Sequence, residues 1–143
     1  MVIKFLRYVL TQDDYKSLTD ADDLEVLQSS DFSKRQQAEI RAQGFMSGYL
    51  RSRYDVEAIF AASGEARDAN IIGYMVDIVL YDLCASIPGR FVSETRKERY
   101  KDAKSWLKDV QNGQFDLELP LKDDDDSGNP IQWGSSTKQT NDW

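Results

Sequence analysis

The sequence contains no histidine and only one cysteine, and both scarcities narrow the chemistry open to the chain. Histidine is the usual general base, the commonest metal ligand and the usual partner of a nucleophilic serine or cysteine. The single cysteine, Cys84, excludes an internal disulfide, and its apolar neighbours predict an inert buried thiol. The composition therefore argues against an enzyme, and no residue pattern predicts a cofactor or a metal site.

Long hydrophobic runs are also missing. No stretch approaches the ~20 apolar residues of a membrane-spanning helix. The apolar N-terminus lacks the small-residue cleavage site of a signal peptide, so a buried segment is the better interpretation. We therefore expect no membrane association.

The charges are mostly acidic, with 25 Asp and Glu residues against 18 Lys and Arg residues and a net charge of −7. Such a surface repels phosphate backbones, so specific nucleic-acid binding is not expected. Residues 11–31 and the tail after Phe115 are acidic, whereas residues 90–108 are locally basic. Patches of opposite sign suit head-to-tail packing of copies around a ring.

The spacing of apolar residues predicts a mainly all-α protein, a bundle of four to five helices, because apolar side chains recur every three or four positions. A short N-terminal helix, two long helices and a basic amphipathic helix are expected in that order. The short helix covers 11–18, the first long helix runs from Asp31 or Ser33 to 54, and the second runs from Asp68 or Asn70 to 86. The basic helix covers 93–112, with Ser93 as its cap. The third of these is apolar nearly all round, which places it at the centre of the bundle. An apolar connection between the long helices can add a further helical turn.

After Gly113 the helical spacing gives way to alternation of apolar and polar residues, which predicts a short strand or an extended arm at 115–121. We therefore divide the chain into a helical domain, 1–121, and a flexible acidic tail, 122–143. The tail carries Ile131, Trp133 and Trp143 in surroundings too polar to form a core. They are candidate anchors for a partner's pocket, and the alternative is disorder with incidental tryptophans.

Arg53 is out of place in this pattern. At 100° per residue it falls beside Tyr49 and Leu50, on the apolar face of the first long helix. A buried guanidinium needs a partner, and the acids of the central helix, Asp77 and Asp82, are the candidates. The alternative is that Arg53 extends past the helix end into solvent. A structural ion pair explains these carboxylates better than catalysis does, since no cleft, histidine or activated nucleophile accompanies them.

Several segments, in this order and spacing, resemble the phage Mu gene-product-36-like family of small virion proteins. They are Leu10–Asp20, Gly48–Tyr54, Asp77–Tyr81 and Arg99–Gly113, with a short echo at Ile131–Ser135. The packing motif expected within them comprises Tyr49, Leu50, Tyr54, Tyr100, Trp106 and Leu107. One departure is that residues 55–59 lack the proline of the family's loop.

The resemblance implies a head–tail connector or head-completion protein that forms a ring, commonly of twelve copies, between the portal and tail-side proteins of a virion. It implies a place at the head–tail junction, with assembly in the bacterial cytoplasm. It also implies that Arg53 and Asp77 form a structural pair. The competing hypothesis is a monomeric helical adaptor, or a regulatory protein-binding domain, of phage or prophage origin.

Overall fold

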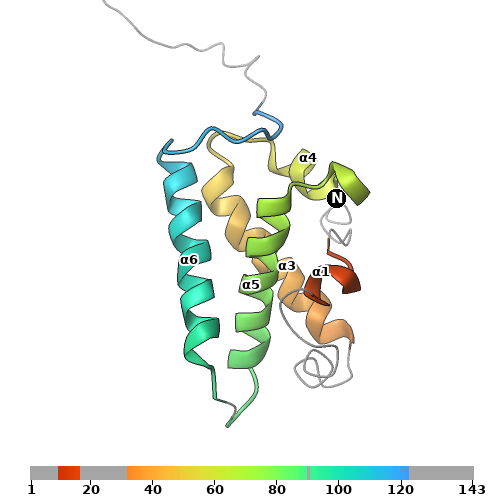
Figure 1. Cartoon of the computed structure of the whole chain (residues 1–143). Coiled ribbons are helices and arrows are strands. Elements are labelled where there is room, and N and C mark those ends of the chain that lie inside the picture. The colour runs from red at the N-terminus through yellow and green to blue at the C-terminus, as the bar shows by residue number, and fades with distance from the viewer. Residues whose placement is uncertain (1–9, 17–31, 90, 123–143) are drawn as a thin grey trace, which may run out of the picture.

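The structure is a computed structural model that describes residues 10–16, 32–89 and 91–122, and the statements below concern these residues. Figure 1 shows a bundle of helices. The elements in chain order are α1 (Gln12–Lys16), α3 (Phe32–Leu50), α4 (Val56–Ala61), a 3₁₀ turn (Gly64–Ala66), α5 (Ala69–Ala85) and α6 (Glu94–Gln111). The described part of the chain contains no strand, which confirms the predicted all-α bundle.

Three long helices, α3, α5 and α6, pack against one another in pairs, and α5 also contacts α1. In Figure 1, α6 lies beside α5, while α3 crosses behind them. Nine of the seventeen residues of α5 are buried, as its apolar composition predicts. None of the described helices combines the length and the hydropathy that a membrane crossing would require.

Local signals fix where α5 and α6 begin. The carboxylate of Asp68 accepts a hydrogen bond from the Ile71 amide at 3.0 Å, and the Ser93 hydroxyl accepts one from the Arg96 amide at 3.2 Å. Each cap satisfies an amide that the first helical turn leaves without a backbone partner. Gly113 follows α6 with a φ of 82°, a conformation that glycine adopts without strain.

The first long helix ends at Leu50, four residues before the expected Tyr54. Asp55 caps the next helix by accepting a hydrogen bond from the Ala58 amide, so the chain must leave the helical conformation before it. The expected connection thus contains a complete short helix, α4.

The segment after α6 is an extended arm that crosses the end of the bundle. Tyr54 and Leu121 form a single antiparallel bridge, in which the Asp55 amide donates to the Pro120 carbonyl at 2.9 Å. The Lys122 amide donates to the Arg53 carbonyl at 3.1 Å. Of the two expected forms for residues 115–121, the extended arm is therefore the one present.

Candidate functional site

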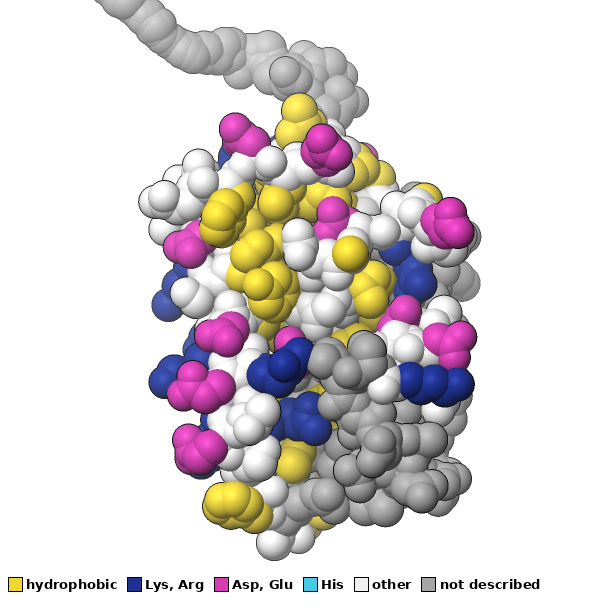
Figure 2. Space-filling view, viewed as in Figure 1, with side chains coloured by type: hydrophobic (Ala, Val, Ile, Leu, Met, Phe, Trp, Pro, Cys, Tyr) yellow, Lys and Arg dark blue, Asp and Glu magenta, His cyan; other side chains and the backbone are white. Residues whose placement is uncertain are grey.

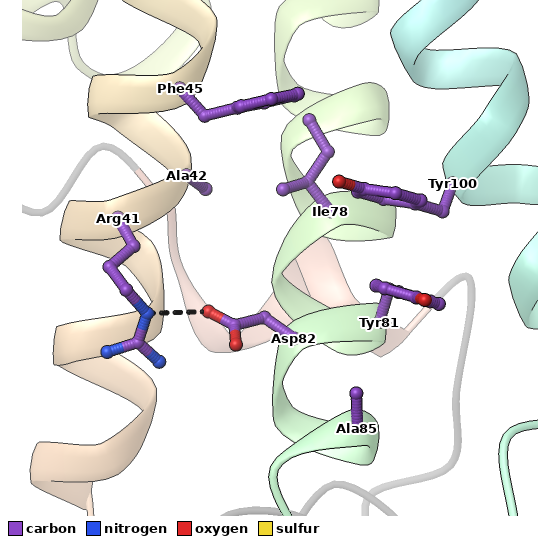
Figure 3. A pocket seen from close by; sticks show the side chains of 8 residues that line it. All are labelled: Arg41, Ala42, Phe45, Ile78, Tyr81, Asp82, Ala85 and Tyr100. Atoms are coloured by element: carbon purple, nitrogen blue, oxygen red, sulfur yellow. Dashed lines mark hydrogen bonds and ion pairs between the residues drawn. The ribbon is translucent and has the colours of Figure 1, made fainter.

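A groove of about 300 Å³ lies where α3, α5 and α6 meet (Figure 3), and we call it the aromatic groove. Its lining residues are Arg41, Ala42 and Phe45 from α3, Ile78, Tyr81, Asp82 and Ala85 from α5, and Tyr100 from α6. From left to right, Figure 3 shows α3, α5 and α6, whereas the lower half of Figure 1 shows α6, α5 and α3. Figure 3 therefore views the bundle from behind, and the groove opens on the side that Figure 1 does not show.

Aromatic rings form much of this surface. Tyr81 and Tyr100 stack with ring centroids 4.1 Å apart and planes 9° apart. Phe45 lies 6.4 Å from Tyr100 and meets Tyr49 edge-on at 5.4 Å. Partial burial, together with Tyr81, Tyr49 and Asp82, raises the pKa of Tyr100, so its ring stays neutral. Flat, partly exposed rings in this arrangement suit contact with an apolar or aromatic group.

An ion pair closes one end of the groove. The Arg41 Nε donates to an Asp82 carboxylate oxygen at 2.8 Å, and the dashed line in Figure 3 marks this contact. Because 56% of the Arg41 side chain and 31% of the Asp82 side chain are exposed, water still reaches both groups. Such a pair orients polar atoms at the rim and adds little to stability.

The other acid of α5, Asp77, is buried between helices. The Arg99 Nε from α6 donates to its carboxylate at 2.8 Å, and only 8% of the Asp77 side chain is exposed. Burial raises the pKa of Asp77 despite the opposing effect of Arg99. The pair therefore ties α5 to α6 at a site where Arg99 is the hydrogen-bonded partner of the carboxylate, and the charge of Arg96 adds a smaller effect.

The predicted ion pair between Arg53 and either acid of α5 is wrong, because Asp77 and Asp82 pair with other arginines. Arg53 instead donates to the carbonyls of Val110 and Phe115, at 3.3 and 3.2 Å, and to the Asp116 carboxylate at 3.1 Å.

The error has a physical cause. The prediction extended the helical spacing to Arg53, but α3 ends at Leu50, and the following turn directs the side chain toward the end of α6. The alternative, extension past the helix end, describes it better, since 33% of the side chain is exposed.

A buried polar cluster between α1 and α3 was not predicted. The Tyr15 hydroxyl donates to the Glu39 carboxylate, and Arg35 bridges Glu39 and the Gln12 side chain. Burial raises the pKa of both Tyr15 and Glu39. The signal was available in the sequence, because Arg35 and Glu39 lie four apart on the same face of α3 as Ala42.

A largely buried ion pair between Arg67 and Asp14 also holds the short helix α1. Arg67 contacts both oxygens of Asp14, one of which also accepts the Thr11 amide. Burial alone would raise the pKa of Asp14, but the bonds from Arg67 and Thr11 outweigh it and lower the pKa.

The expected packing motif is placed as follows. Leu50, Tyr54, Trp106 and Leu107 are buried in the core, whereas Tyr49 and Tyr100 are partly buried against it. Tyr74 stacks on Trp106 at 4.6 Å. The tail residues Ile131, Trp133 and Trp143 lie outside the described residues.

The thiol of Cys84 is buried, and its Sγ lies 3.7 Å from the Phe91 carbonyl. The aromatic groove itself presents flat rings, one ion pair and an apolar floor.

These features define the class of the protein, an all-α bundle whose most distinctive surface is an aromatic groove between its long helices. Residues 4–132 match the family described as Bacteriophage Mu, Gp36. Because this match spans most of the 143 residues, the chain belongs to that phage family, and the resemblance drawn from its motifs is confirmed. Comparisons with curated proteins and with solved structures give no significant match.

Proposed function

We propose that this phage protein is a structural subunit of the virion that forms a connector ring at the head–tail junction, between the portal and the tail. The observation that carries the proposal is membership of the Bacteriophage Mu, Gp36 family over residues 4–132. The proposal assigns the protein no catalytic role. The partners of the protein are other copies of itself, the portal and a tail-side protein. The ring assembles in the bacterial cytoplasm and then remains part of the virion.

The sides of the bundle support packing in a ring. A ring of identical copies needs two different surfaces on each copy, one of which meets the other on the neighbour. The aromatic groove occupies one side of the bundle. Figure 2 shows hydrophobic side chains gathered along the line between α5 and α6 on the opposite side. The two sides thus present apolar surfaces of different shape, as packing between neighbouring copies in a ring requires.

The two ends of the bundle support contacts along the tail axis. Phe91 is 77% exposed and lies just before the start of α6. Leu121 is 68% exposed and pairs with Tyr54 at the other end of the bundle, where Arg53 contacts the last turn of α6. Large exposed hydrophobic residues at opposite ends suit a subunit that is held between two different proteins.

Sedimentation and light scattering test the proposal on the full chain, alone and mixed with the portal protein of the same phage. We expect a closed ring at high concentration or on the portal. A chain that stays monomeric at high concentration and with the portal present would overturn the proposal in favour of the monomeric adaptor.

Surface variants sharpen this test. We expect Phe91→Ser or Leu121→Ser to weaken binding to one axial partner each while the helical content stays unchanged. Ile40→Ser is the matched control, because Ile40 is a partly exposed hydrophobic residue within α3 and not at an end of the bundle. Equal loss of portal binding in all three variants would contradict the assignment of the ends.

A further inference from the structure

We infer that the aromatic groove is the docking site of the chain's own C-terminal segment, residues 129–135, with Trp133 as the anchoring side chain. The inference concerns the isolated chain, in which no neighbouring copy covers the groove, and it does not depend on ring formation, where a neighbour would have to displace the tail. It rests on the shape of the groove, on a polar group at its rim, on the point where the tail leaves the bundle and on the charges along the path.

The groove suits one large aromatic side chain. Its volume of about 300 Å³ is at the lower end of the range for ligand pockets. The stacked Tyr81 and Tyr100 rings offer a flat surface. Gly44 and Gly48 follow the lining residues Arg41 and Phe45 by three positions on α3, and a methyl group added at either would meet nothing within 4 Å, so this side of the helix leaves room for an incoming segment.

The rim supplies the polar contact that a tryptophan needs. An indole buries a large apolar area but keeps one N–H donor that requires an acceptor. The Asp82 carboxylate, held at the end of the groove by Arg41, is such an acceptor, and 31% of its side chain remains exposed. Arg41 adds a cation at the same end, and cations are favourable against the face of an indole ring.

The tail starts close enough to reach the groove. The Tyr54–Leu121 bridge fixes the exit point near the C-terminal end of α3, while Arg41 and Phe45 lie within the last ten residues of that helix. At 1.5 Å per residue, this is about 8–14 Å along the helix axis. The chain from Lys122 to Trp133 can span at most about 40 Å. The tether therefore has ample slack.

The charges along this path are complementary. Lys104 Nζ lies 5.5 Å from the centre of the Tyr100 ring, and Lys108 follows one turn later, toward the end of α6 where the arm begins. Four consecutive aspartates, 123–126, come directly after Lys122. A pair of exposed opposite charges contributes little, but two lysines on α6 and four aspartates at the start of the tail favour a path along that helix.

The sequence of the segment favours Trp133 over Trp143. Ile131 and Trp133 are two residues apart, so in an extended segment both side chains fall on one face. A tether of this length also gives an effective concentration in the millimolar range, so a contact too weak to form between separate molecules is populated within one chain.

Fluorine NMR of the full chain labelled with fluorotryptophan tests the inference at concentrations where sedimentation shows a monomer. Trp133→Phe and Trp143→Phe assign the signals. We expect the Trp133 signal to lie away from its position in urea and to return there in Ala85→Arg, which fills the groove from an exposed position on α5. Ala61→Arg is the matched control, since Ala61 is an exposed helical alanine outside the groove, and it should leave the signal in place.

A photo-cross-linking amino acid at position 135, two residues after the retained Trp133, provides a second measurement. It is applied to an equal mixture of ¹⁴N and ¹⁵N copies, so that links within and between chains are separated by mass. We expect links within one copy to α3, α5 or α6 around the groove.

A Trp133 signal at the urea position, a signal unchanged by Ala85→Arg, or links that fall elsewhere or join two copies would overturn the inference. Ring formation on the portal is measured separately, so these outcomes leave the proposed function standing.

Discussion

Arg99→Ala should destabilise the protein far more than Arg41→Ala, although the two arginines make ion pairs of the same length. Both pairs join α5 to a neighbouring helix with an N–O distance of 2.8 Å. They differ in the acid, because 8% of the Asp77 side chain is exposed against 31% for Asp82. Removing Arg99 leaves a buried carboxylate without its hydrogen-bonded cation and with only the weaker charge effect of Arg96, whereas Asp82 can turn to water.

The expected magnitudes follow from that difference. Loss of one partner from a buried pair costs ~3–5 kcal/mol, and the lower end applies here because 41% of the Arg99 side chain is exposed. Loss of an exposed pair costs about 0–1 kcal/mol. At an m-value of about 1–3 kcal/mol/M, a 3 kcal/mol loss lowers the urea midpoint by about 1–3 M. Circular dichroism at 222 nm follows the unfolding.

A second substitution isolates the charge. In Arg99→Ala/Asp77→Asn the buried group is neutral, so most of the loss should be recovered relative to Arg99→Ala. Equal midpoints for Arg99→Ala and Arg41→Ala, or no recovery in the double variant, would refute the reasoning.

The same pair predicts a pH dependence. Because the folded-state pKa of Asp77 is raised above its ordinary value of 3.8, its contribution to stability is fully present below pH 3.8 and is lost as the pH rises through the folded-state pKa. Without Arg99 the pKa rises further, so the penalty of Arg99→Ala should be largest at neutral pH and should shrink on acidification. A penalty independent of pH would show that lost packing, and not charge, is responsible.

Three further substitutions test other contacts. Tyr15→Phe removes a donor from the buried Glu39 carboxylate and should lower the free energy of unfolding by about 1–3 kcal/mol. Amide hydrogen exchange in α1 should become faster, and an unchanged exchange rate would contradict this prediction. Arg53→Ala should release the extended arm after α6 and lower the free energy of unfolding by about 1–2 kcal/mol, less than the loss of a buried ion pair. Hydrogen exchange of the Lys122 amide measures this release. Asp68→Ala should lower the free energy of unfolding by about 0.5–2 kcal/mol through loss of the α5 cap, and an unchanged urea midpoint would exclude that role.

The sequence predicts best those features that local chemistry decides. The starts of α5 and α6 follow from Asp68 and Ser93, because a capping side chain acts on amides only three residues away. The central place of α5 follows from its composition, because a helix that is apolar all round cannot face water.

Features that depend on distant parts of the chain are predicted poorly. The partner predicted for Arg53 is wrong because the end of α3 is set by the new helix α4, which Asp55 caps. Without that end, the direction of the Arg53 side chain cannot be predicted. The aromatic groove could not be predicted, since Phe45, Tyr81 and Tyr100 meet only through the crossing of three helices. The Tyr15–Glu39 contact spans 24 positions, and only the position of Glu39 on an apolar face indicates it.

Arg53 also makes the end of the bundle behave as one cooperative unit. The last turn of a helix ordinarily frays alone, because its final carbonyls have no partner within the helix. Here the Val110 carbonyl of α6 and the Phe115 carbonyl share one guanidinium, and the backbone of that arginine holds the Lys122 amide. The end of α6, the chain after it and the turn after α3 should therefore exchange their amide protons at one common rate, much slower than that of a free helix end.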